Sequence, residues 1–460
     1  MVGSGAAERP DAAALRSAVV GRAEAAGLRL VRFLYCDHDS VIRGKASGLS
    51  HLADRLEGGI GLTVAMQAFT MLDRLATVEG MGPVGEIRLV PDLDTFVVAP
   101  YAPRTGVVLV DMTTRDRQPY AADGRQFLRR MVRRAAEHDL EIVAAFEPEW
   151  TLARPADGGW EPFDRSPCFS SEGMQGPAEV IDDLVGALEA QDLTVEQYYP
   201  ELGWGQQELS IQHAPALSAA DRHLHYRETV RAIAGRHGLA ASFAPKPWPD
   251  QPGNGCHLHL SAWTAGVNRF AAAAGGSGLS ELGLQFVAGV LAHLPALLAL
   301  TCPSVSSYRR LRPQTWASAY RAWGPDNREA AVRAASPFWG HEAESANIEL
   351  KACDSSCNPH LALGGVIAAG LDGVARRLAP PPPVMVDPHT LDGRERERLG
   401  AVPHPRSLSE ALDNLRADPL LMEALGERLS TSYIAVKESD VDGFAAQDEA
   451  FEYAAHRFRF

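Results

Sequence analysis

Three short segments of this 460-residue chain carry ionisable side chains two residues apart, within runs that otherwise have the composition of β-strands. Side chains alternate between the two faces of a strand, so residues two apart point to the same side. Charged groups are costly to bury unless they are paired or bound to metal. These strands therefore predict a cation where they meet. The pairs are Glu147 and Glu149 in FEPEW, His257 and His259 in GCHLHLS, and Glu349 and Lys351 in IELKA.

Taken singly, each pair has an ordinary explanation. A Glu-x-Glu on a strand is usually a solvated face, and a His-x-His is often structural or exposed. Glu201 and Glu208, in ELGWGQQE, would by default be a loop charge and an edge charge. The order in which all these residues occur along the chain decides between the two interpretations.

Composition narrows the class of protein. The chain is 46% hydrophobic and 22% charged, which suits a sizeable core and is unlike a disordered chain. The formal net charge of −14 argues against nucleic acid or an anionic membrane as a partner. The six cysteines form no CxxC pair, the amino terminus lacks a signal sequence, and the most apolar run, 286–300, is too short to span a bilayer. We therefore expect a cytoplasmic protein with free thiols.

The chain divides into two predicted domains after a disordered segment at 1–10. A helix at 11–26, a hairpin of strands at 28–35 and 41–46, and short strands at 96–99 and 107–110 predict a small mixed α/β domain over 11–115. A polar stretch at 115–123 marks the boundary, and a larger domain follows over 120–460. Its predicted helices are 127–139, 177–191 and 279–300, its predicted strands are 142–152, 206–213, 255–263 and 346–352, and Ser407-x-x-Glu410 is a capping box.

The segment KPWPDQPGNGCHLHLS, at 246–261, resembles the glutamine synthetase signature. Lys-Pro, a spacer, a Gly-x-Gly turn, a histidine and a serine four residues later fill the pattern as Lys246, Pro247, Gly253, Gly255, His257 and Ser261. The other blocks of the family follow in the same order along the chain. They are Glu147 and Glu149; Glu201, Gly205, Gln206 and Glu208; Tyr308, Arg310 and Leu311; Asn327, Arg328 and Arg333; Glu349; and Asn358-Pro359.

This resemblance implies an α+β fold of the glutamine synthetase type. A small N-terminal β-grasp-like domain would precede a large catalytic domain with a curved antiparallel sheet and flanking helices. Members of the family form stacked rings, so the resemblance also implies a homo-oligomer, a dodecamer of two rings. Their active sites lie between the small domain of one subunit and the large domain of its neighbour.

The resemblance implies a reaction as well. Glutamine synthetases use ATP to phosphorylate the γ-carboxylate of glutamate, and an amine then displaces phosphate. Two or more divalent cations assist, and a ligand set rich in oxygen suits Mg²⁺ or Mn²⁺. By resemblance, one metal is held by Glu149, Glu201 and Glu208. The other is held by Glu147, His257 and Glu349.

The remaining site residues are also assigned by resemblance. Arg310 would clamp the α-carboxylate of glutamate, since a planar guanidinium suits bidentate pairing, and Gly253 lies in the turn that approaches glutamate. His259 and Ser261 would contact the phosphates of the nucleotide, and Glu196 would contact its ribose. Arg328 and Arg333 would neutralise the ATP phosphates, although arginines in so Arg-rich a chain can equally be surface ion-pair partners.

Three positions depart from the pattern of the ammonia-using members. Their early acidic segment corresponds here to GIGLTVAMQAFTMLD, which has no acid before Asp73. Trp316 stands where they carry a glutamate that helps to bind ammonium and take its proton. Lys351 replaces an arginine and keeps the charge without the bidentate geometry.

The first two departures lie in the half of the site that receives the amine. We expect a γ-glutamyl-amine ligase in which Trp316 and the apolar segment around Met66 to Met71 contact the acceptor. Ethanolamine is favoured over a polyamine, because a polycation requires acids that only Asp73 and Glu79 could supply. An ordinary glutamine synthetase and a catalytically silent structural or regulatory member remain the alternatives.

Overall fold

The computed structural model describes residues 12–157, 159–272 and 278–460; the segment 1–10, predicted to be disordered, lies outside them. The N-terminal part forms a sheet of order β2-β1-β6-β4-β3, with β5 also on β6. The predicted hairpin is confirmed, because β1 and β2 pair antiparallel, and β1 pairs parallel with β6. The elements are α1 (Ala12–Ala25), β1 (Leu30–Cys36), β2 (Ile42–Gly48), α2 (Leu52–Gly58), β3 (Ile60–Thr63), β4 (Glu86–Pro91), β5 (Val97–Val98) and β6 (Thr105–Thr113).

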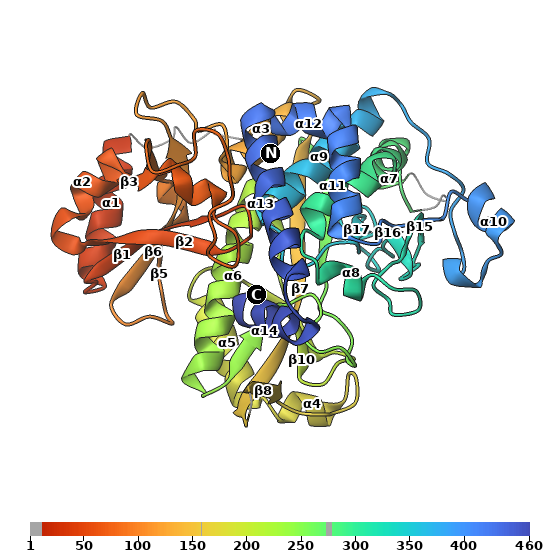
Figure 1. Cartoon of the computed structure of the whole chain (residues 1–460), viewed down its shortest axis with the longest axis horizontal. Coiled ribbons are helices and arrows are strands. Elements are labelled where there is room, and N and C mark those ends of the chain that lie inside the picture. The colour runs from red at the N-terminus through yellow and green to blue at the C-terminus, as the bar shows by residue number, and fades with distance from the viewer. Residues whose placement is uncertain (1–11, 158, 273–277) are drawn as a thin grey trace.

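The larger part of the chain is built on a second sheet, whose central order is β18-β15-β16-β17-β13-β7-β10-β9. Its described pairs are antiparallel except β15 with β16, which run parallel. The long β7, near the middle of the molecule in Figure 1, is the hub of this sheet. The strands β8, β10, β11, β12 and β13 all pair with it. The strands are β7 (Glu141–Ala156), β8 (Gly159–Pro162), β9 (Val195–Pro200), β10 (Gln206–Ile211), β11 (Ala214–Pro215), β12 (Ala240–Ser242), β13 (Cys256–Thr264), β14 (Val267–Asn268), β15 (Tyr320–Pro325), β16 (Ala330–Ala334), β17 (Ile348–Leu350) and β18 (Val402–Pro403).

Helices cover this sheet and close the core. The Ser407 hydroxyl caps α11 as predicted, but the Glu410 carboxylate accepts the backbone N–H of Arg406 instead of returning to the cap residue. The helices are α3 (Gly124–Ala136), α4 (Ser171–Gln175), α5 (Ala178–Glu189), α6 (Ala216–Arg236), α7 (Glu281–Thr301), α8 (Ser307–Arg310), α9 (Pro359–Ala375), α10 (Gly393–Arg398), α11 (Leu408–Ala417), α12 (Pro419–Leu425), α13 (Glu427–Ala445) and α14 (Glu449–Arg459).

The main core lies between one face of the second sheet and the helices α7 and α9. Phe146, Leu258 and Leu350 alternate with the ionisable residues of their strands and are buried against these helices. A Cβ on Gly289 of α7 would overlap the backbone of α9, so glycine allows the two helices to pack closely. Among the described residues α7 is the one helix long and apolar enough to cross a membrane, yet most of its apolar stretch is buried inside the protein. The apolar composition of α7 is therefore explained by its place in the core.

Candidate active site

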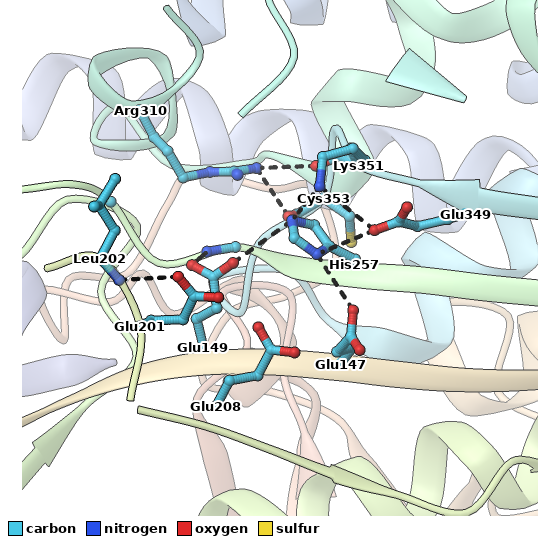
Figure 2. Close-up of polar contacts among 12 residues, drawn as sticks. Glu147, Glu149, Glu201, Leu202, Glu208, His257, Arg310, Glu349, Lys351 and Cys353 are labelled. Carbon is cyan, nitrogen blue, oxygen red and sulfur yellow. Dashed lines mark hydrogen bonds and ion pairs between the residues drawn. The ribbon is translucent and has the colours of Figure 1, made fainter. Parts of the chain in front are cut away.

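The ionisable residues of five strands form one row across the face of the second sheet that is turned away from α7 and α9. Residues directly opposite each other on antiparallel strands share a face. The register between β7, β10, β13, β16 and β17 therefore brings together side chains that are up to 200 residues apart in sequence (Figure 2). The opposed pairs are Glu149 with Glu208, Glu147 with His257, His259 with Glu349, and Arg333 with Glu349.

One end of this row combines two imidazoles with two carboxylates. His257 Nδ1 lies 3.5 Å from Glu147 Oε2 and 3.3 Å from Glu349 Oε1, and His259 Nε2 lies 3.4 Å and 3.9 Å from the same two carboxylates. Glu147, His259 and Glu349 each offer a ligand atom within 4.8 Å of the others, close enough to hold one metal ion. Both histidines thus reach this set, whereas the sequence assigned His257 to the metal and His259 to the nucleotide.

The other end gathers three carboxylates, those of Glu149, Glu201 and Glu208. Glu149 Oε2 accepts hydrogen bonds of 2.8 Å from Gln206 Nε2 and from the backbone N–H of Gly255. Burial, followed by the charge of Glu149, raises the pKa of Glu201 to about 7. Burial and the charges of the other glutamates raise the pKa of Glu208 well above its ordinary value. A divalent cation would relieve this repulsion, so the donor set fits the predicted metal.

The two ends of the row differ in charge balance. Burial alone would raise the pKa of Glu349, but Lys351, the two histidines and Arg333 hold it far below its ordinary value. The hydrogen bond that His259 donates to Glu147, with the charges of Glu147 and Glu349, outweighs burial and raises the pKa of His259 to about 9. Positive charge therefore outweighs burial at the imidazole end, whereas at the three-carboxylate end the charge of Lys351 only partly offsets burial and repulsion.

The cationic side chains lie above this row, as Figure 2 shows for Arg310 and Lys351. Arg310 is 4% exposed and donates to the backbone carbonyls of Lys351 (3.3 Å) and Cys353 (2.9 Å). Lys351 Nζ lies 3.3 Å from His257 Nε2. A Cβ on Gly253 would meet the Arg310 side chain at 2.6 Å, so this turn approaches the arginine as closely as glycine permits.

Other predicted residues lie at the rim or are engaged elsewhere. Arg333 contacts Glu349, and the Ser261 hydroxyl accepts a 2.9 Å hydrogen bond from Trp263 Nε1. Arg328 and Glu196 are exposed, and the described part of the chain provides no ion pair for either. The Trp316 side chain is 56% exposed and stands on a loop beside the row.

The predicted apolar acceptor wall is not assembled within one chain. The segment around Met66 to Met71 buries most of its side chains in the N-terminal domain and, at Met71, in a core shared with the larger domain; the N-terminal sheet lies across the molecule from α8 and β15 in Figure 1. Asp73, named in the sequence as an acid for a polycation, instead pairs with Arg43 at 3.0 Å and Arg459 at 3.3 Å. Its charge is therefore already compensated.

Three residues near the row were missed by the sequence analysis. The Tyr199 hydroxyl donates to Glu208, its opposite residue on the neighbouring strand, and Asn347 Oδ1 lies 2.9 Å from His259 Nδ1. Glu329 lies beneath the Trp316 loop and accepts a 2.8 Å hydrogen bond from its backbone N–H. Tyr199 and Asn347 could be found only from strand register, whereas Glu329 follows Arg328 directly within a motif already recognised.

Comparisons with known proteins agree with the fold. Residues 121–456 match the glutamine synthetase catalytic domain and residues 12–122 match the glutamine synthetase N-terminal domain. The gamma-glutamylpolyamine synthetase of Streptomyces coelicolor is 37% identical over 456 residues, 98% of each chain, and the glutamine synthetase of Pyrococcus abyssi is 33% identical over 92% of each. The solved GmaS/ADP complex superposes with a TM-score of 0.83 at 28% identity, covering 94% of this chain and 98% of that one.

These matches extend over nearly the whole chain. The protein is an ATP-dependent ligase with a two-domain α+β architecture. It belongs to the glutamine synthetase family.

Proposed function

We propose that the protein joins the γ-carboxylate of glutamate to a primary amine at the expense of ATP, by way of γ-glutamyl phosphate. The row of carboxylates and imidazoles would hold two Mg²⁺ or Mn²⁺ ions, which when bound supply Lewis-acid stabilisation of phosphoryl oxygens. Arg310 would pair with the α-carboxylate of glutamate. Arg328, Arg333 and Lys351 would neutralise the charge of ATP and of the group in transfer.

The observation that carries this proposal is the contrast between the two halves of the site. The cation-binding row is complete and aligned by strand register, whereas the acceptor half carries Trp316 in place of an acid. An indole does not neutralise ammonium but packs well against an alkyl chain. An organic amine is therefore a better acceptor than ammonia.

Among organic amines, the similarity to a relative named gamma-glutamylpolyamine synthetase supports a polyamine or alkyl diamine. Ethanolamine was favoured from the sequence for want of acids near the acceptor. Glu329, buried beside the Trp316 loop, weakens that reason. We therefore propose an amine of the polyamine class, with ethanolamine as the second candidate.

We propose a homo-oligomer as well, of the stacked-ring dodecamer type. Trp316 lies on the loop between α8 and β15, and Figure 1 shows these two elements across the molecule from the N-terminal sheet, which the segment around Met66 to Met71 adjoins. Trp316 and this segment would meet only where the N-terminal domain of one subunit faces the catalytic domain of another.

Phosphate release with glutamate, ATP and Mg²⁺ tests the proposal across a panel of ammonium, ethanolamine, butane-1,4-diamine and spermidine. We expect a higher kcat/KM for a diamine or polyamine than for ammonium. Release without any response to an amine supports the silent alternative, and a preference for ammonium supports an ordinary glutamine synthetase. Reactions without glutamate are the control for unrelated ATP hydrolysis.

A further inference from the structure

The turn before β16 carries a buried carboxylate that belongs neither to the row of ionisable residues nor to the ion pairs of the site arginines. Glu329 is 7% exposed, and its Oε1 accepts the backbone N–H of Trp316 at 2.8 Å. Its Oε2 is buried and has no hydrogen-bond partner among the described residues. A buried carboxylate oxygen without a donor is destabilising, so a group that is missing from the free protein is needed to satisfy it.

Glu329 lies at the edge of the reaction centre. It follows Arg328 and precedes β16, the strand on which Arg333 contacts Glu349. Burial raises the pKa of Glu329, while the charge of Lys351 opposes that rise, so the two side chains are near enough to interact. The charge of Lys351, whose Nζ contacts His257 and Glu349, therefore acts on this carboxylate.

The loop above Glu329 combines strain with an exposed aromatic side chain. Gln314, Trp316 and Ser318 all have positive φ, at 61°, 57° and 61°, a conformation that costs energy for any residue but glycine. The hydrogen bond from Trp316 to Glu329 helps to hold this loop in place. Strained segments beside a site are suited to rearrangement when a ligand arrives.

The same turn fixes a second loop. Asn327 Nδ2 donates to the carbonyls of Val384 (2.7 Å) and Val386 (3.0 Å), and the intervening Met385 side chain is exposed. A single turn therefore positions one buried acid and two loops with exposed apolar side chains. An acid flanked by apolar surface is complementary to a protonated amine with an alkyl chain.

We propose that Glu329 receives the positively charged nitrogen of the acceptor amine, with Trp316 and Met385 against its alkyl part. The Trp316 loop moves to uncover Oε2, and the ammonium group supplies the donor that this oxygen lacks. Glu329 thus provides the negative charge that the ammonia-using pattern places at position 316. This inference rests on the proposed amine ligation and names the residue that recognises the amine.

Glu329→Gln tests the proposal, because glutamine keeps an oxygen for the Trp316 N–H and removes only the charge. We expect the KM for butane-1,4-diamine to rise about 10- to 100-fold, the worth of a charged hydrogen bond. The KM values for glutamate, for ATP and for hydroxylamine, an amine nucleophile uncharged at neutral pH, should stay within about 3-fold. Glu329→Asp should recover most of the loss.

The alternative outcomes are distinct. An equal change in the KM values for hydroxylamine and the diamine would mean that Glu329 only anchors the loop, and it would overturn the proposal. Unchanged KM values for both amines would overturn it as well. Wild-type protein that forms no γ-glutamylamide from any amine refutes the proposed function itself. If Glu329→Gln does not fold, salt dependence in the wild type decides: NaCl should raise the KM for the diamine and not that for hydroxylamine, and an equal response contradicts the proposal.

Discussion

Two clusters of buried charge in this molecule are built in opposite ways. At the junction of the domains, Arg125 of α3 donates to Asp221 at 2.6 and 2.9 Å, to Asp111 at 2.7 Å and to Asp92 at 2.7 Å. Every carboxylate there faces a guanidinium. In the row of the active site Glu149, Glu201 and Glu208 face one another, and the charge of Lys351 does not offset burial and repulsion at Glu201.

This difference in charge balance indicates that the Arg125 cluster stabilises the fold and that the three carboxylates of the active site serve function. The charge of Arg125 outweighs burial and holds the pKa of Asp221 far below its ordinary value, so this network favours the folded state. In the catalytic row, repulsion raises carboxyl pKa values and opposes folding until a ligand arrives. A cluster that the chain compensates is structural, whereas a cluster left uncompensated points to a bound cation.

The largest expected effect comes from the catalytic row. Glu149→Ala should lower the rate of amine-dependent phosphate release about 1,000-fold, because losing a ligand misplaces a cation worth several kcal/mol to the transition state. The thermal unfolding temperature without metal should change little, since the loss of the hydrogen bonds from Gln206 and Gly255 is offset by the removal of a repelling charge. Glu141→Ala, an exposed site on the same strand, is the control. Activity within a few-fold of wild type would remove Glu149 from the metal set.

A substitution at the domain junction should lower stability and leave the amine preference unchanged. Arg125→Ala removes the guanidinium that three carboxylates share and leaves Asp92 and Asp111 only with Arg129, and Asp221 with His360, which should cost about 3–5 kcal/mol in the free energy of unfolding. Denaturant titration followed by circular dichroism measures this loss, and Arg133→Ala on the exposed side of α3 is the matched control. The protein that remains folded should keep its amine preference. A loss below about 1 kcal/mol would show that the network is not a stabilising one.

The pH dependence of stability should have opposite signs in the two clusters. Glu201, with a pKa raised to about 7 by burial and Glu149, holds a proton in the folded chain that the unfolded chain releases near 4.5. Metal-free stability should therefore fall as pH rises from about 4.5 to 7, and Mg²⁺ should remove this fall. Asp221, with a lowered pKa, contributes stability that is lost only as pH drops below about 3.8.

Melting temperatures across this pH range, with EDTA and with Mg²⁺, measure the effect. Glu201→Gln should flatten the metal-free profile between pH 4.5 and 7, because glutamine carries no charge to be penalised. An unchanged slope in this variant would place the titrating group elsewhere.

The smallest expected effect concerns the acceptor loop. Trp316→Glu restores an acid beside the amine and should shift the ratio of kcat/KM values toward ammonium by about 10-fold, the equivalent of roughly 1.4 kcal/mol. Trp316→Ala should weaken organic amines while leaving the KM for ATP alone. Unchanged selectivity in Trp316→Ala would exclude contact between the indole and the acceptor.

The elements around the site were predictable because their patterns are regular. The pairs Glu147–Glu149 and His257–His259 lie on strands, as the spacing of two residues predicts. Apolar neighbours such as Phe146 and Leu258 point to the other face of the sheet and are buried in the core. Helix α6 was not predicted, because buried polar residues such as His223 and Arg227 obscure its amphipathic pattern. Their burial depends on partners from other elements, which the local sequence does not reveal.

Motifs could name candidate residues for the site but not the geometry between them. Motif order identified the residues, whereas the contacts of His259 with Glu147 and Glu349 depend on the register between β7, β13 and β17. Register between distant strands comes from tertiary packing. For the same reason the compensation of Asp73 by Arg459, from the opposite end of the chain, could not be anticipated.

A direct competition tests the central claim, that the cation-binding half is retained while the acceptor half is rebuilt for an organic amine. Wild-type protein receives ATP, glutamate, Mg²⁺ and equal concentrations of ammonium and butane-1,4-diamine, and mass spectrometry quantifies both amides. The account predicts more γ-glutamyl-diamine than glutamine, with neither product formed by Glu149→Ala. Faster formation of glutamine, repeated when spermidine or ethanolamine replaces the diamine, would contradict it.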